Sequence, residues 1–152
     1  MIGRLSIEEI EDVLKKNTFG HLGCNDGNRT YIVPINYVYD NKYIIAHSVV
    51  GKKVQMMRTN PQVCFEVDEI ENYNSWKSVI IWGEYKELKE ERDRYQAIKF
   101  FVDRMMYMKI SETAIPPEIS ENRVHPRSPG YVKPVIYRIV ISEKTGRYEI
   151  GK

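Results

Sequence analysis

Hydrophobic and polar positions alternate along much of the chain, in short runs rich in β-branched and aromatic residues. This period of two is typical of strands that bury one face. Turn-forming residues, such as Asn25-Asp26-Gly27-Asn28 and Asp40-Asn41, separate the first runs and predict hairpins. The predicted strands cover residues 18–24, 30–39, 42–47, 62–67, 75–88 and 135–142. Six strands with short connections indicate an antiparallel barrel, because closure of a sheet removes its exposed edges.

Three details of these strands have structural consequences. Pro34 has no amide hydrogen, so the strand that contains it is expected at a sheet edge or a bulge. The continuous apolar run Val79-Ile80-Ile81-Trp82 indicates a strand buried on both faces. Thr145-Gly146 predicts a turn after the last strand.

Helical spacing of hydrophobic residues appears in three places. Ser6-Ile7-Glu8-Glu9 has the form of a capping box and predicts a helix over residues 6–16. A second helix is predicted from Gly51 to about Thr59, bounded by Pro61, and a third from Glu90 to about Met108. The prediction is therefore a mainly β barrel decorated by flanking helices.

The region from Ser111 to Lys133 is rich in proline and predicts no regular element. A long irregular stretch in a compact domain is usually functional or covers a site, and His125 and Arg127 lie in it. No repeat, low-complexity tract or linker interrupts the chain. Residues 1–152 are therefore predicted to form a single domain.

Composition excludes several classes of function. Of the 152 residues, 42% are hydrophobic and 29% are charged, which is ordinary for a globular protein. The formal net charge is only +2 and the basic residues are interleaved with acidic ones, so nucleic acid is not an expected partner. With no signal peptide and no stretch approaching ~20 apolar residues, no membrane association is expected and a cytoplasmic location is predicted.

The cysteines and histidines lack the spacing of a metal or redox site. Cys24 and Cys64 are far apart, without CxxC spacing, and are expected to be reduced thiols in the core. The three histidines have no ligand-like spacing with each other or with the cysteines. The sequence therefore predicts no metal site, and His21 is assigned a structural role.

The segment Gly51-Lys52-Lys53 combines a strand end, a helix start and two positive charges. Helix N-termini offer unpaired N–H groups and a positive dipole end, and Gly51 permits close approach of a ligand to the backbone. The segment is a candidate phosphate cradle; alternatively, it is a solvated basic turn. Two interpretations are open for Arg58 as well: its side chain either reaches the same phosphate or forms a salt bridge at the helix end.

The order of several segments resembles the pyridoxamine 5'-phosphate oxidase-like family of flavin-binding split barrels, especially its nitroimidazole-resistance-related group. The resemblance covers roughly residues 3–146. The segments that carry it are Tyr31-Ile32-Val33-Pro34-Ile35-Asn36, Ile45-Ala46-His47-Ser48, Gly51-Lys52-Lys53 through Arg58-Thr59-Asn60-Pro61, Val63-Cys64-Phe65-Glu66-Val67-Asp68, Trp76 to Gly83, and Tyr137-Arg138-Ile139. The resemblance implies a six-stranded antiparallel split β-barrel that binds FMN.

The resemblance also implies a set of cofactor contacts. A strand passing the isoalloxazine ring would contribute Val33, Pro34, Ile35 and Asn36, and His47 and Ser48 would lie near the ring and ribityl chain. Gly51, Lys52 and Lys53 would hold the phosphate, and Ser78 would add a polar flavin contact. Because the family is dimeric with the flavin between subunits, a homodimer is expected. The C-terminal part lacks a match to the tryptophan and arginine that serve the flavin in the oxidase itself, so vitamin B6 oxidation is not expected.

Three functional hypotheses follow. The first is an FMN-dependent oxidoreductase that takes electrons from a separate donor and reduces a small electrophile, with His47 as proton donor. Alternatively, His47 is a polar strand-end residue that only hydrogen-bonds backbone. The second is a flavin carrier or sensor without turnover, and the third is a haem protein with His47 or His125 as axial ligand. An absorption spectrum separates flavin from haem.

Overall fold

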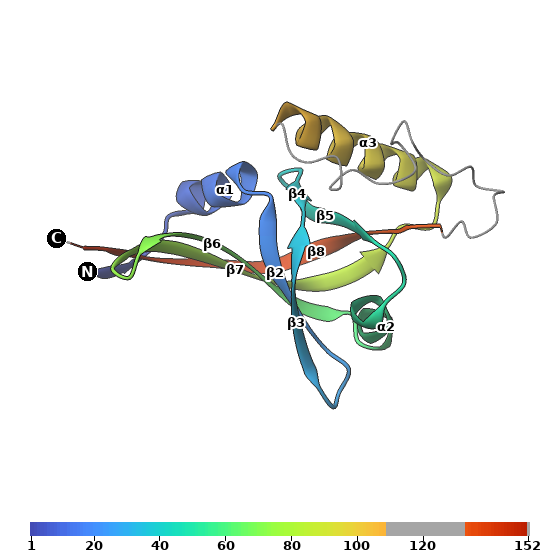
Figure 1. The fold of residues 1–152 in the computed structure, drawn as a ribbon, viewed down its shortest axis with the longest axis horizontal. Coiled ribbons are helices and arrows are strands. Elements are labelled where there is room, and N and C mark those ends of the chain that lie inside the picture. Colours follow the sequence, from blue (N-terminus) through green and yellow to red (C-terminus); the bar gives the residue numbers. More distant parts are fainter. Residues whose placement is uncertain (109–132, 152) are drawn as a thin grey trace.

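A computed structural model describes residues 1–108 and 133–151 (Figure 1). One antiparallel sheet, strongly curled into a half-barrel, carries three helices on its outside and ends. The strands are β1 (Ile2–Arg4), β2 (Phe19–Asn25), β3 (Thr30–Asn36), β4 (Val38–Tyr39), β5 (Tyr43–Ser48), β6 (Gln62–Asn72), β7 (Ser75–Glu87) and β8 (Val135–Ile150). The helices are α1 (Ile7–Lys16), α2 (Lys52–Thr59) and α3 (Glu91–Tyr107).

The strand order explains why the barrel is split. Along the sheet the order is β3-β2-β6-β7-β8-β5-β4, and β1 pairs with β8. The two ends of this path, β3 and β4, follow each other in the chain but are not paired with each other. Pro34 lies in the edge strand β3, as predicted from its missing amide hydrogen.

Alternating side chains of the strands build the main core. Val63, Phe65 and Val67 of β6 face inward and are buried, and they pack with Leu22 of β2 and Tyr37. Helix α1 covers one end of this core through buried residues such as Val13 and Leu14. The predicted capping box is confirmed: the Glu9 N–H donates to Ser6 Oγ (3.2 Å), and the Ser6 N–H donates to Glu9 Oε2 (2.7 Å).

A second core lies on the opposite face of β5 and β8, beneath α3. Phe101 and Met105 of α3 pack there against Ile45 of β5 and Ile136 of β8. Strand β5 therefore has two buried faces: Ile44 and Ala46 point into the main core, and Ile45 points toward α3.

Four sequence-based expectations about the strands differ from the structure. Strand β1 was not predicted, and the predicted strand 30–39 is divided into β3 and β4. The turn predicted at Thr145-Gly146 is wrong, because both residues continue β8 and pair with Ile80 and Val79 of the long strand β7. Burial of β7 on both faces is also wrong, because Trp82 is 48% exposed.

The cysteines are both free thiols, as expected, but only one lies in the core. Cys24 is buried, whereas Cys64 is half-buried and points away from the main core. No helix in the described part of the chain is long and apolar enough to cross a bilayer. Most of the irregular stretch predicted from 111 to 133, including His125 and Arg127, lies outside the described residues.

Candidate functional site

The segment that the sequence singled out, Gly51-Lys52-Lys53, forms the N-terminus of α2. Strand β5 ends at Ser48, and Gly51 is the N-cap of α2 with extended backbone (φ −145°, ψ −166°) and no side-chain capping hydrogen bond. A Cβ placed on Gly51 would meet only the Val49 carbonyl oxygen, at 4.0 Å. The first amide groups of a helix have no partner within the helix and carry the positive end of its dipole, and at this end of α2 no side chain caps them.

Two lysines surround this helix end. The Lys52 Nζ lies 5.1 Å from the ring centroid of Tyr31 in β3. Lys53 is half-buried beside Cys24 of β2, and burial lowers the pKa of its ammonium group. Among the residues that the structure describes, neither lysine forms an ion pair. The site thus gathers positive charge that no carboxylate of the described chain neutralises.

The other end of α2 is fully engaged within the chain. Arg58 makes a bidentate pair with Glu87 of β7, with Nη2–Oε1 at 2.7 Å and Nε–Oε2 at 3.0 Å. Asn60, the C-cap, donates from Nδ2 to the Asn25 carbonyl oxygen at 2.8 Å. Of the two readings of Arg58, the structure confirms the salt bridge.

The edge strand β3 brings further predicted residues toward this region. Its start is joined to α2 by the contact between Tyr31 and Lys52. Val33 and Ile35 point to the core side of the strand, and Pro34 points outward. The Asn36 Oδ1 atom is buried and has no hydrogen-bond partner in the described part of the chain, so the strand carries a polar atom whose hydrogen-bonding capacity is unused.

The two polar residues at the end of β5 lie on opposite faces of that strand. The His47 ring packs edge-on against Phe101 of α3, with centroids 5.0 Å apart. The Ser48 side chain is buried and donates from Oγ to the Val49 carbonyl oxygen at 2.7 Å. Because successive side chains of a strand point to opposite faces, a flat ligand could contact His47 and Ser48 only from different sides of β5.

Ser78 does not join this group. It lies on the outer face of β7, where its Oγ donates to Glu66 Oε2 at 2.9 Å. On the other side of Glu66, His21 Nδ1 lies 3.4 Å from Oε1. Burial, followed by contact with Asp68, raises the pKa of Glu66.

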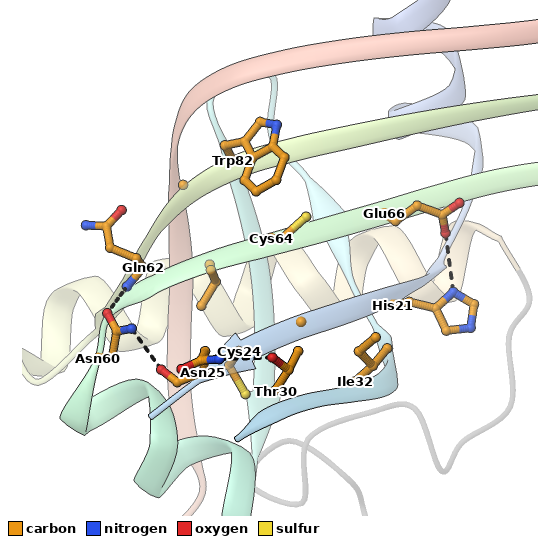
Figure 2. A pocket seen from close by; sticks show the side chains of 13 residues that line it. His21, Cys24, Asn25, Thr30, Ile32, Asn60, Gln62, Cys64, Glu66 and Trp82 are labelled. Atoms are coloured by element: carbon orange, nitrogen blue, oxygen red, sulfur yellow. Dashed lines mark hydrogen bonds and ion pairs between the residues drawn. The ribbon is translucent and has the colours of Figure 1, made fainter. Parts of the chain in front are cut away.

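A groove of about 580 Å³ crosses the outer faces of β2, β3, β6 and β7 (Figure 2). Trp82, Cys64 and Ile32 give it an apolar lining, and the pair of His21 and Glu66 closes one end. Asn25, Asn60 and Gln62 lie at the other end. The sequence did not reveal this groove. Its walls come from four strands, and local sequence patterns do not determine how these strands pair with one another.

Comparison with known proteins points to one family. A family model for pyridoxamine 5'-phosphate oxidase matches residues 6–148. An uncharacterized protein from Rhizobium meliloti (strain 1021) is 34% identical over 84 residues, which are 55% of this chain and 56% of that protein.

Solved structures share the fold over nearly the whole chain. The crystal structure of a FAD-binding protein from Mesorhizobium loti is 28% identical, with a TM-score of 0.73, and the match covers 99% of this chain and 98% of that one. A candidate 5-nitroimidazole antibiotic resistance protein from Bacteroides thetaiotaomicron VPI-5482 is 16% identical, with a TM-score of 0.68 over 97% and 87% of the two chains. At that identity the second likeness shows the fold alone. The split barrel implied by the sequence resemblance is confirmed.

Proposed function

The chain belongs to the pyridoxamine 5'-phosphate oxidase family, and from this premise we propose that it binds FMN with the phosphate at the N-terminus of α2. The observation that carries the proposal is the pair Lys52 and Lys53, which surrounds an uncapped helix end without an ion pair in the described chain. A phosphate dianion placed there would accept hydrogen bonds from the first amides of α2 and from both ammonium groups.

The residues present fit a flavin in other respects too. Gly51 leaves the space above the helix end free, since a Cβ would meet only one atom within 4 Å. The buried, unpartnered Asn36 Oδ1 lies on the edge strand expected to run past the ring. An edge strand keeps backbone N–H and C=O groups that no neighbouring strand occupies, and these can bind the polar rim of a ring. The FAD-binding protein from M. loti supports a flavin as the ligand class.

The proposed activity is reduction of a small electrophile, with electrons taken from a separate donor. When bound, the flavin supplies the electron-transfer chemistry. The chain's own part is to bind and orient: Lys52 and Lys53 fix the phosphate, and Val33, Pro34, Ile35 and Asn36 flank the ring. His47 is the candidate to hold and move a proton, because imidazole titrates near neutrality. Ser48 would contact the ribityl chain. Ser78 would contact the flavin from the outer face of the sheet.

We also propose a homodimer formed through the outer face of the sheet. Ile32 is 66% and Trp82 48% exposed there, on the walls of an apolar groove. A second copy would bury this surface and bring Ser78 toward a shared cofactor. Trp82→Asp should give a folded monomer by light scattering, whereas a wild-type protein that is monomeric at micromolar concentration contradicts the dimer. A cytoplasmic location, where Cys24 and Cys64 remain thiols, belongs to the same proposal.

The absorption spectrum of the purified protein tests the ligand class. We expect flavin bands and, after denaturation, release of FMN identified by chromatography against FAD and riboflavin standards. A haem spectrum, or no chromophore after incubation with FMN, contradicts the proposal. Anaerobic bleaching by NADH or NADPH, followed by reoxidation with a nitroaromatic acceptor, separates an enzyme from a flavin carrier, which would bleach without turnover.

A further inference from the structure

Three potential metal ligands meet on the outer face of the sheet. His21 of β2 is directly paired with Glu66 of β6, and Asp68 follows two positions later on the same face of β6. The His21 Nδ1–Glu66 Oε1 distance is 3.4 Å. One ligand atom from each of the three residues lies within 4.8 Å of the other two.

We propose that His21, Glu66 and Asp68 bind a divalent transition-metal ion of the Zn²⁺ type. Zn²⁺ takes imidazole nitrogen and carboxylate oxygen at about 2.0–2.2 Å, which puts ligand atoms ~3.4 Å apart in a tetrahedral site. The His21–Glu66 separation already has this value, and an Asp68 carboxylate oxygen lies within 4.8 Å of the ligand atoms of both other residues. Three protein ligands leave a fourth position for water or a substrate atom.

The charges around the cluster favour a cation. Glu66 and Asp68 bring two carboxylates together, and this contact adds to burial in raising the Glu66 pKa. In the described chain, no lysine or arginine forms an ion pair with either carboxylate. A divalent ion would remove the repulsion between the two carboxylates. It would also replace the contact between the His21 imidazole and Glu66 by a coordinate bond to the metal.

A supporting hydrogen bond orients the central ligand. Ser78 Oγ donates to Glu66 Oε2 at 2.9 Å, which leaves Oε1 directed toward His21. Such outer contacts hold metal ligands in place. His21 and Glu66 also line the end of the apolar groove (Figure 2), so the ion would border that groove, on a different face from the N-terminus of α2.

Calorimetric titration of Zn²⁺ into the purified protein, stripped of metal with a chelator, tests the site. We expect one saturable Zn²⁺ per chain and no competition from excess Mg²⁺, which prefers all-oxygen sites. His21→Ala and Asp68→Asn should each weaken Zn²⁺ binding at least about tenfold, and Ser78→Ala by about tenfold, as loss of outer-shell partners does. His21 is exposed and Asp68 and Ser78 are partly exposed, so these variants should keep the circular dichroism spectrum of the wild type.

Two matched variants exclude other ligands. Glu84→Gln removes an exposed carboxylate from the same face of β7, and Cys64→Ser removes the nearby thiol; both should keep wild-type affinity. The proposal is overturned if the wild type binds no stoichiometric Zn²⁺, if His21→Ala and Asp68→Asn bind it unchanged, or if Cys64→Ser abolishes binding. Flavin content measured in His21→Ala and Asp68→Asn reports on the flavin site separately, because neither residue is among the proposed flavin contacts.

Discussion

The two ends of α2 carry basic side chains in opposite situations. At the C-terminal end, Arg58 is held by a bidentate pair with Glu87. At the N-terminal end, the Lys52 ammonium lies over the ring of Tyr31, and neither Lys52 nor the half-buried Lys53 forms an ion pair in the described chain. Both ends are basic in the sequence, and only the contacts distinguish them.

The difference shows how to separate structural from functional charge. The Arg58 charge has a structural role, because its partner Glu87 lies within the chain and accepts both hydrogen bonds of the guanidinium group. The Lys53 charge has no such structural role, because partial burial of an ammonium group without an opposite charge costs free energy. A phosphate bound at the helix N-terminus would supply that missing charge.

Reversing the charge of Lys53 should have the largest effect on FMN binding. Lys53→Glu should lose most bound FMN, with affinity lower by roughly 100-fold or more, because one charge-assisted contact contributes about 1.5–3 kcal/mol and repulsion of the phosphate adds to its loss. Fluorescence titration with FMN measures the change, and circular dichroism checks the fold.

Arg58→Glu is the matched control, because it reverses a charge at the other end of the same helix. It should bind FMN normally per folded chain. Equal loss of FMN in both variants would mean that affinity follows the general charge or integrity of α2, and it would remove the distinction between the two ends.

His47 tests whether chemistry, and not only binding, takes place near the N-terminal end of α2. His47→Ala should leave FMN bound but slow reoxidation of the reduced protein by acceptor, by roughly 100-fold if His47 transfers a proton. Stopped-flow absorbance measures this rate. A lower melting temperature with unchanged turnover would instead assign His47 to packing against Phe101.

Local patterns predicted the parts of the fold that local interactions determine. The Ser6 capping box and the start of α2 after Gly51 depend on residues within one helical turn, and both were found where the sequence indicated. Thr145-Gly146 has turn chemistry, yet the long partner strand β7 keeps both residues in β8. Pairing with a distant strand decides such positions.

The same limit applies to the sites. Lys52 and Lys53 adjoin in sequence, so their gathering at one helix end was predictable. His21, Glu66, Asp68 and Ser78 come together only through the register of β2, β6 and β7. Their sequence spacing gave no metal signature for this reason.

Arg58→Gln should lower the stability of the fold slightly and leave FMN binding unchanged. The Arg58 guanidinium lowers the pKa of Glu87, so the pair stabilises the fold above the usual glutamate range and loses this contribution as the pH falls through the lowered pKa. The pair is partly exposed, so we expect a slightly lower melting temperature at pH 7 and no difference from wild type in strong acid. A change in FMN affinity would contradict the assignment of Arg58 as structural.

Parallel titrations with FMN and riboflavin test the phosphate site most directly, because the two ligands differ only in the phosphate. The titrations compare the wild type with Lys52→Ala and Lys53→Ala. FMN should bind much more tightly than riboflavin to the wild type. Each substitution should weaken FMN roughly tenfold to a hundredfold, with the larger loss at the half-buried Lys53, and leave riboflavin almost unchanged. If the substitutions weaken both ligands equally, or weaken neither, Lys52 and Lys53 do not bind the phosphate.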